Sequence, residues 1–405
     1  MNRRYVIFYW HLFSARDWQR FACDAMIARG YTVQVIELGE ALESLKICDL
    51  ARSDFTSVAQ TSRPADKAAV LSVLDRLTPR DLILTLIPIQ PSYLWLHLEL
   101  GRRGLHYVQL SLGRLPTRPT WRLLARYDSC SAATVFFQSF SHLAYRIKFH
   151  LKLIAEMGLD YFRIPPPLLW GRAGSWRDLI STEGVHLWRS EVVELESLDV
   201  AWARASEHVA INVPNTAFAV YVDESLHDHP DYAITGIPAP VEKESFFPAL
   251  RQTFDRIERE QGLEVVVALH PKANYSPQEL EQYFGNRQAI SAQTPALIQN
   301  SVLVLLHNST SVAYAVLSRK PILFLTNHDI DKSWLRSDLD VRSHWLDQPI
   351  HNIDVVDSNE LNGIPRPIVD ERRYADFESH FLRSPQAKVG TAVEIVADRF
   401  EALAP

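Results

Sequence analysis

The sequence has 405 residues, of which 47% are hydrophobic, 10% aromatic and 22% charged. This composition is typical of globular proteins, suits about two domains of ordinary size, and excludes disordered, collagen-like and coiled-coil proteins. The 42 Lys and Arg residues and the 48 Asp and Glu residues give a net charge of −6. Because no overall basic surface exists, we expect no nucleic-acid partner.

Cysteine usage and the apolar runs indicate the compartment. The three cysteines, Cys23, Cys48 and Cys130, lack metal-site spacing and cannot all pair, which indicates a reducing compartment. The apolar run at residues 5–10 is short for a secretory signal, and no small-residue cleavage site follows it. No run of ~18 apolar residues predicts a transmembrane helix. We therefore expect a cytoplasmic protein, and peripheral contact with the inner membrane stays open.

The first half of the chain alternates between short apolar runs and helical patterns. Strands are predicted at residues 5–10, 31–38, 81–87 and 106–112, and helices at 14–30 and 92–103. Ser14 followed by Asp17 predicts the start of the first helix, and Gly30 predicts its end. Residues 114–205 are expected to be more helical and less regular, with a long amphipathic stretch at about 190–206. Strands separated by helices predict a mostly parallel sheet.

The second half repeats this alternation. Strands are predicted at residues 208–213, 218–223, 264–269, 301–306 and 321–325, and helices at 242–261, 294–300, 309–317 and 387–403. The predicted fold class is α/β, with two Rossmann-like doubly wound domains at residues 1–205 and 206–385 and a C-terminal helix at 386–405. Ligands of such sheets bind beyond the carboxyl ends of the strands, which makes polar residues at those ends candidate site residues.

Polar residues follow three predicted strands of the second half. They are Asp223, Glu224 and Ser225 after one strand, His270, Pro271 and Lys272 after the next, and His307, Asn308, Ser309, Thr310 and Ser311 after a third. Because parallel strands end at the same edge of a sheet, these groups are expected to meet in one crevice.

Each group suits chemistry at a phosphate or a hydroxyl. The hydroxyl residues at 309–311 start a predicted helix, where backbone N–H groups favour an anion, although a simple helix cap is the alternative. His270 can donate to a departing phosphate and Lys272 supplies a positive charge, unless the histidine caps its own strand and the lysine is solvated. Asp223 or Glu224 can act as a general base, unless the pair lies in a solvated loop.

A metal site is an alternative use of the same region. His227, His229 and Asp231 alternate along the chain and can ligate a divalent metal, but this pattern lacks a distant further ligand. Two Asp-x-Asp triplets, at 329–331 and 338–340, lie in a predicted polar loop and are discounted. We therefore predict no metal site. The sequence also contains no P-loop and no Gly-x-Gly-x-x-Gly motif.

Four segments in a fixed order carry a family resemblance. They are VDES (222–225), HDHPDY (227–232), ALHPKANY (268–275) and LLHNSTSVAYAVLSRKPILFL (305–325). Together they resemble bacterial surface-carbohydrate glycosyltransferases of GT-B architecture that use CMP-activated sugars, namely sialyltransferases, polysialyltransferases and Kdo transferases. The resemblance covers about residues 195–330 and implies two Rossmann-like domains with a cleft between them.

The resemblance also implies roles for the strand-end residues. In those families two acidic residues followed by Gly supply the general base, which here corresponds to Asp223 and Glu224, with Ser225 in place of Gly. Their His-Pro pair contacts the CMP phosphate or ribose, which corresponds to residues 270–271, and their Ser/Thr motif holds the phosphate, which corresponds to residues 309–311. These enzymes generally invert the anomeric centre and need no metal. The implied reaction is a direct displacement, in which the carboxylate accepts the proton of an attacking acceptor hydroxyl.

The predicted nucleotide site also includes Lys272, His307 and Asn308. The donor is expected to be a nucleotide sugar, with no other cofactor, and the sugar to be a nonulosonic acid or Kdo. The acceptor is expected to be a cell-surface glycan or a lipid-linked glycan, held by the first domain. Three alternatives stay open: a CDP-glycerol type of donor, a metal-dependent hydrolase or epimerase on a similar fold, and a catalytically degenerate nucleotide-binding subunit.

A basic segment suggests where the protein works. Residues 114–178 contain ten basic and four acidic residues, a net charge of +6, with aromatic residues such as Trp121 and Trp170 among them. Basic residues beside Trp and Tyr suit an anionic membrane surface. An equal alternative is that the aromatic residues belong to an ordinary core and the arginines are solvated. The membrane is therefore one candidate partner.

Overall fold

The computed structural model describes most of the chain, as two compact units. The described residues are 3–10, 12–42, 60–87, 93–116, 165–175, 189–207, 211, 213, 216–229, 232, 237–355 and 363–403. The first unit comprises Met1–Leu112, Asp128–Glu196 and Arg383–Pro405, and the second comprises Gly113–Tyr127 and Ser197–Leu382. Within the described residues, no helix is both long and apolar enough to cross a bilayer.

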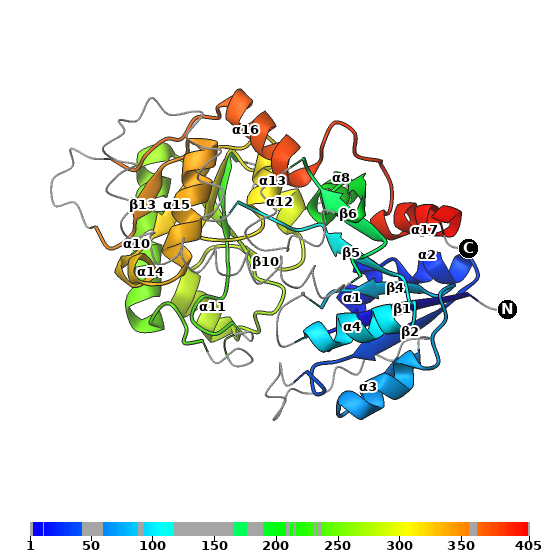
Figure 1. The fold of residues 1–405 in the computed structure, drawn as a ribbon. Helices are drawn as coiled ribbons and strands as arrows, with labels where there is room; N and C mark the ends of the chain where they lie inside the picture. The colour runs from blue at the N-terminus through cyan, green and yellow to red at the C-terminus, as the bar shows by residue number, and fades with distance from the viewer. Residues whose placement is uncertain are drawn as a thin grey trace, which may run out of the picture. The chain divides into compact units, whose positions relative to one another are not determined.

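The described strands of the first unit form one parallel sheet of order β3-β2-β1-β4-β5-β6-β7. The strands are β1 (Arg3–Tyr9), β2 (Tyr31–Glu37), β3 (Gln60–Ser62), β4 (Leu82–Thr85), β5 (Tyr107–Ser111), β6 (Leu169–Ala173) and β7 (Glu191–Leu195). The helices are α1 (Ala15–Arg20), α2 (Cys23–Ala28), α3 (Lys67–Leu74), α4 (Leu94–Arg102) and α17 (Ala392–Leu403). The strand order reverses at β1, as expected for a doubly wound sheet (Figure 1).

The predicted helix at 14–30 is two helices. Ser14 starts α1 with a capping box, because its hydroxyl accepts from the backbone of Asp17 and the Asp17 carboxylate accepts from Ser14. Ala22 then has a left-handed backbone with φ +49°, which interrupts the helical hydrogen bonds and separates α1 from α2. Gly30, with φ +86°, ends the pair as predicted.

Residues 165–205 differ most from the prediction. The amphipathic stretch at about 190–206 is not one element, because Glu191–Leu195 extends the sheet as β7 before helix α8 (Leu198–Ser206) begins. Gly171, in the stretch that was expected to be less regular, lies inside β6. A Cβ atom there would lie 2.4 Å from Leu110 and 2.8 Å from Leu195, so the glycine allows close packing within the sheet.

The described strands of the second unit form a parallel sheet of order β10-β9-β8-β11-β12-β13. The strands are β8 (Phe218–Val222), β9 (Glu264–Ala268), β10 (Ala289–Ile290), β11 (Leu303–Leu306), β12 (Ile322–Thr326) and β13 (Ile350–Asn352). The helices besides α8 are α10 (Lys243–Gln261), α11 (Pro277–Phe284), α12 (Thr294–Asn300), α13 (Val312–Leu317), α14 (His328–Lys332), α15 (Leu335–Leu346) and α16 (Glu371–Phe377), which continues into a π-helical turn (Glu378–Leu382). This order places the reversal point between β8 and β11.

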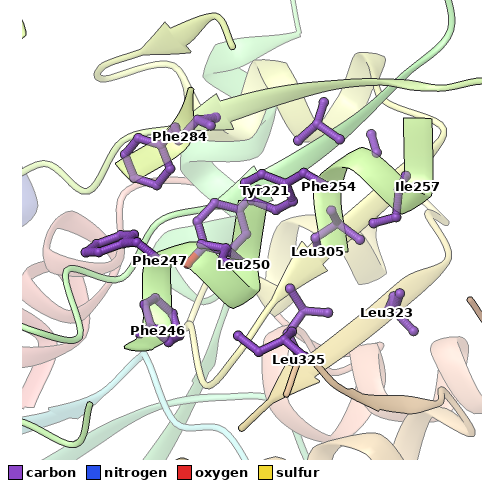
Figure 2. Close-up of a cluster of buried hydrophobic side chains, with 14 of the residues drawn as sticks. Tyr221, Phe246, Phe247, Leu250, Phe254, Ile257, Phe284, Leu305, Leu323 and Leu325 are labelled. Carbon is purple, nitrogen blue, oxygen red and sulfur yellow. The ribbon is translucent and has the colours of Figure 1, made fainter. Parts of the chain in front are cut away.

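Helix α10 covers one face of the second sheet. Its buried residues recur every three or four positions, which is the spacing of an amphipathic helix; they include Phe246, Phe247, Leu250, Phe254 and Ile257. Figure 2 shows these side chains beside Tyr221 of β8, whose ring centroid lies 5.1 Å from that of Phe254. Gly262, with φ +68°, ends the helix as predicted.

The units differ from the predicted domains at both boundaries. The first boundary lies at Glu196 and Ser197, before α8, and not at residue 205. The C-terminal residues from Arg383 belong to the first unit, where Arg29 pairs with Asp398 of α17. The predicted strand at 208–213 falls mostly outside the described residues.

We expect Phe254→Ala to destabilise the second unit by ~3–5 kcal/mol, because a fully buried ring would leave a cavity in the core. Chemical denaturation followed by circular dichroism measures this change. Ile368→Ala is the matched control, since its side chain is 84% exposed and its removal should change little. Equal unfolding midpoints for wild type and Phe254→Ala would contradict the packing described.

Candidate active site at the carboxyl ends of β8, β9 and β11

Asp223 lies directly after β8 and binds the loop that follows β9. Its carboxylate accepts hydrogen bonds from the backbone N–H of Ser225 (3.0 Å) and of His270 (3.2 Å), and from the Tyr275 hydroxyl (3.1 Å). The residue is only 4% exposed. Burial raises the pKa of this carboxyl, and the three hydrogen bonds oppose that effect by favouring the charged form.

Glu224 makes the equivalent connection to the other neighbouring strand. Its two carboxylate oxygens accept from the backbone N–H groups of His307 (2.8 Å) and Asn308 (3.0 Å), which follow β11. Burial raises the pKa of Glu224 to about 7, against the lowering effects of these two hydrogen bonds and of Arg342. A carboxyl with such a pKa is half ionised near neutral pH, which suits a general base.

Ser225 has the backbone conformation of a glycine. Its φ is +48°, in the left-handed region, and it is 2% exposed. The resemblance stated above places a Gly at this position, and the structure gives the physical reason for that residue, since Gly adopts positive φ without a steric cost. A glycine at this position would adopt the same turn without strain.

The predicted residues of the β9 loop are placed by backbone contacts. The Nδ1 atom of His270 accepts from the backbone N–H of Lys272 at 3.2 Å, which assigns the proton of the neutral ring to Nε2. The ring lies edge-on to His229, with centroids 4.8 Å apart. The side chains of Pro271 and Lys272 are exposed. His270 thus presents a donor with a defined orientation.

The side chain of His307 corrects one prediction. It was expected to bind nucleotide, but the ring is 0% exposed and lies in the core of the unit. Its Nδ1–H donates to the carbonyl of Leu325 (2.8 Å), and its Nε2 accepts from the Tyr221 hydroxyl (3.2 Å). Burial lowers the pKa of His307 to about 4, so the ring is neutral. Only its backbone N–H, through Glu224, belongs to the site.

The hydroxyl residues precede the helix instead of starting it. Helix α13 begins at Val312 and has only six residues, so Ser309 and Thr310 lie in the loop before it. The Ser309 hydroxyl accepts from the backbone N–H of Ser311 at 3.1 Å, and Thr310 is exposed. The Oδ1 atom of Asn308 is buried and finds no hydrogen-bond donor in the part of the chain that the structure describes.

Two residues of this region were not predicted from the sequence. Tyr275 bonds Asp223, as described above. Arg342 of α15 is 6% exposed, and its Nη1 donates to the carbonyls of Asn308 (2.6 Å) and Ser309 (3.3 Å). A signal for Arg342 exists in the sequence, since it falls on the buried stripe of its helix, formed by Leu335, Leu339, Arg342 and Leu346. A charged residue on such a stripe indicates a buried contact.

The two histidines of the alternative metal site have separate surroundings. The His227 ring stacks on Tyr275 and meets Phe247 and Tyr283 edge-on, whereas His229 lies against His270. Asp231 lies outside the described residues. Among those that are described, no three His, Cys, Asp or Glu side chains are grouped to hold a metal ion. The Asp-x-Asp triplets lie in helices α14 and α15, not in a loop.

The basic segment at residues 114–178 lies mostly outside the described residues. Arg172 is described, and it is buried in β6 with its guanidinium 3.1 Å from Glu194. The membrane-docking hypothesis therefore stays a prediction.

Comparisons with known proteins bear on the fold. The sequence matches no family model and no curated protein. The structure is similar to a variant of the wall teichoic acid polymerase TagF, with a TM-score of 0.50 and 13% identity over 99% of this chain and 89% of that chain. The fold is of the GT-B type.

Two further GT-B structures are similar at lower scores. For the spinosyn forosaminyltransferase SpnP, the TM-score is 0.43 and the identity 10%, over 99% of this chain and 96% of that chain. For MurG from Acinetobacter baumannii, the TM-score is 0.45 and the identity 8%, over 99% of this chain and 100% of that chain.

Glu224 should make the GT-B protein less stable as the pH rises from about 4.5 to about 7. In this window the folded state keeps a proton that the unfolded state has released, so the free energy of unfolding falls with pH. In Glu224→Gln this contribution to the pH dependence should be absent. Denaturant titrations at several pH values measure it as the difference in free energy of unfolding between wild type and the variant.

Glu260→Gln is the control for this pH dependence. The backbone N–H of Ile364 lowers the pKa of Glu260. The free energy of unfolding of Glu260→Gln should therefore differ from that of wild type by a constant amount above pH 4.5. If the free energies of unfolding of wild type and Glu224→Gln changed in parallel with pH, the raised pKa of Glu224 would be contradicted.

Ser225→Gly should leave the protein at least as stable as wild type, because it removes a left-handed strain of ~1 kcal/mol. Ser225→Val should lower the melting temperature, since a β-branched residue tolerates positive φ poorly. Ser301→Gly is the matched control: Ser301 is also buried, but its φ is −76° and its hydroxyl donates to Ile298, so glycine should destabilise there. Equal losses at both positions would refute the backbone argument.

Proposed function

We propose that the protein is a metal-independent, inverting glycosyltransferase that transfers a nonulosonic acid or Kdo from its CMP donor to a cell-surface glycan. One observation carries this proposal. At the reversal point of a GT-B sheet, Glu224, with a pKa raised to about 7, is hydrogen-bonded to the loop that bears Ser309 and Thr310. A base and a group of anion-binding amides are what a displacement with a phosphate leaving group needs.

In this proposal Glu224 is the general base. Each of its oxygens accepts one backbone N–H, and each has a second lone pair that can accept the proton of an acceptor hydroxyl. Asp223 is less accessible, because it is 4% exposed and accepts three hydrogen bonds. Its role is to position the His270 loop, and a catalytic role for Asp223 is the outcome that the experiment below would detect.

The leaving phosphate would lie between His270 and the loop after β11. His270 supplies an Nε2–H donor, held by the Lys272 contact, and exposed Thr310 lies in the second loop. The Oδ1 of Asn308 is buried and accepts no hydrogen bond from the described residues, which favours a ligand that brings a donor, such as a ribose hydroxyl. Lys272 would add positive charge at the rim.

The acceptor and the compartment follow from the same class of reaction. TagF is named a wall teichoic acid polymerase, which supports a surface polymer as the product. The acceptor would be a glycan or lipid-linked glycan, and the enzyme would work in the cytoplasm, where nucleotide sugars are made. CMP, CDP and UDP donors differ in their base and phosphates, so direct binding separates them.

The first experiment is a thermal-shift screen of cytidine, uridine and guanosine nucleotides. A ligand that binds only the folded state stabilises it by ~2.7 kcal/mol at a hundredfold excess over Kd. We expect CMP to raise the melting temperature more than GMP or UMP. No shift with any nucleotide would refute the proposed function, and a preference for CDP would replace the CMP donor by a CDP-linked one.

The second experiment separates binding from chemistry. We expect Glu224→Gln to reduce transfer of the sugar by at least ~100-fold, the usual contribution of a general base, while CMP binding persists. His270→Ala should weaken both the transfer of the sugar and the binding of CMP. Asp223→Asn tests the other carboxylate: a larger loss of transfer than in Glu224→Gln, with the fold intact, would make Asp223 the base. Full transfer by both amide variants would refute both assignments.

A further inference from the structure

Arg342 is a buried cation that no carboxylate among the described residues contacts directly. The guanidinium is 6% exposed, and no Asp or Glu within the described ranges forms an ion pair with it. Its Nε atom also finds no hydrogen-bond acceptor there. Burial lowers the pKa of the guanidinium, and the charges of Asp338 and Glu224 only partly oppose this effect. An anion bound nearby would offset more of the cost of burying the charge.

The contacts of Arg342 are with one loop. Its Nη1 donates to the carbonyls of Asn308 (2.6 Å) and Ser309 (3.3 Å), two successive peptide groups. In a planar trans peptide the C=O and N–H bonds point in opposite directions. Holding these two carbonyls therefore turns the N–H groups of Ser309 and Thr310 away from Arg342.

These two N–H groups are available for a ligand. Neither the Ser309 nor the Thr310 backbone N–H donates a hydrogen bond among the residues that the structure describes. The preceding N–H groups, of His307 and Asn308, are bound by Glu224. The loop is thus held by a carboxylate at its first two amides and by a guanidinium at the next two carbonyls.

We propose that Arg342 is the positioning residue that directs the Ser309 and Thr310 amides toward the phosphate of the donor nucleotide. This inference rests on the proposed function, because it assumes a phosphate at that loop. Arg342 acts through the two backbone carbonyls that it holds, and its positive charge adds to the attraction for the phosphate.

The test compares nucleotides with nucleosides. The purified full-length protein is titrated calorimetrically with CMP, CDP and UDP, and with cytidine and uridine, which lack the phosphate. We expect Arg342→Met to weaken binding of the preferred nucleotide by about tenfold or more, because two oriented amides and a charge are lost, and to leave the nucleoside unchanged. A merely structural role would weaken both ligands equally.

Two further variants make the result decisive. Arg373→Met is the matched control, because Arg373 is also mostly buried and donates to a backbone carbonyl, that of His344 at the end of α15. It should bind both ligands as wild type does. Arg342→Lys keeps the charge but replaces the planar guanidinium, whose Nη1 donates to both carbonyls, by a more strongly hydrated ammonium on a different stem, so an intermediate loss of nucleotide affinity is expected. This variant keeps the test valid if Arg342→Met fails to fold.

The outcomes distinguish the two proposals. Wild-type nucleotide affinity in Arg342→Met or Arg342→Lys, or equal losses for nucleotide and nucleoside, would overturn the role of Arg342. An equal loss in Arg373→Met would also overturn it. Failure of the wild-type protein to bind any of the three nucleotides would refute the proposed function, and this inference with it.

Discussion

Two consecutive carboxylates at the end of β8 connect the three central strand ends of the second unit. Strand β8 lies between β9 and β11, so Asp223 binds the amide that follows one neighbour and Glu224 binds the amides that follow the other. One dipeptide therefore holds the loops of both neighbouring strands. The positions of His270 and of the loop at 307–311 depend on this pair.

The pair also sets the electrostatics of the site. Carboxylates that accept backbone N–H groups are normally strong acids, but here burial outweighs those hydrogen bonds and raises the pKa of both. The fully buried imidazole of His307, which lies beside β8, is held neutral by the same effect. Burial thus gives one of these groups, Glu224, a pKa of about 7, and such perturbed groups are common at functional sites.

The sequence predicted the central strands and the strand-end residues because long apolar runs identify buried parallel strands. Helix α12 was predicted at its observed bounds. Short strands such as β3 and β13, and β7 with its mixed residues, have no such run and were missed. The direction of a side chain was also beyond prediction: the ring of His307 points into the core, and Arg342 reaches the loop from a helix that follows it in the sequence.

The return of the C-terminal residues to the first unit has a consequence for folding during synthesis. Strand β6 packs against α17, and the Tyr31 hydroxyl of β2 donates to Glu401, near the end of the chain. The second unit, which ends at Leu382, is complete before these residues emerge from the ribosome. The usual order, in which the N-terminal domain folds first, is therefore reversed for the final packing of this protein. Until the residues of α17 have emerged, strand β6 lacks the helix that packs against it.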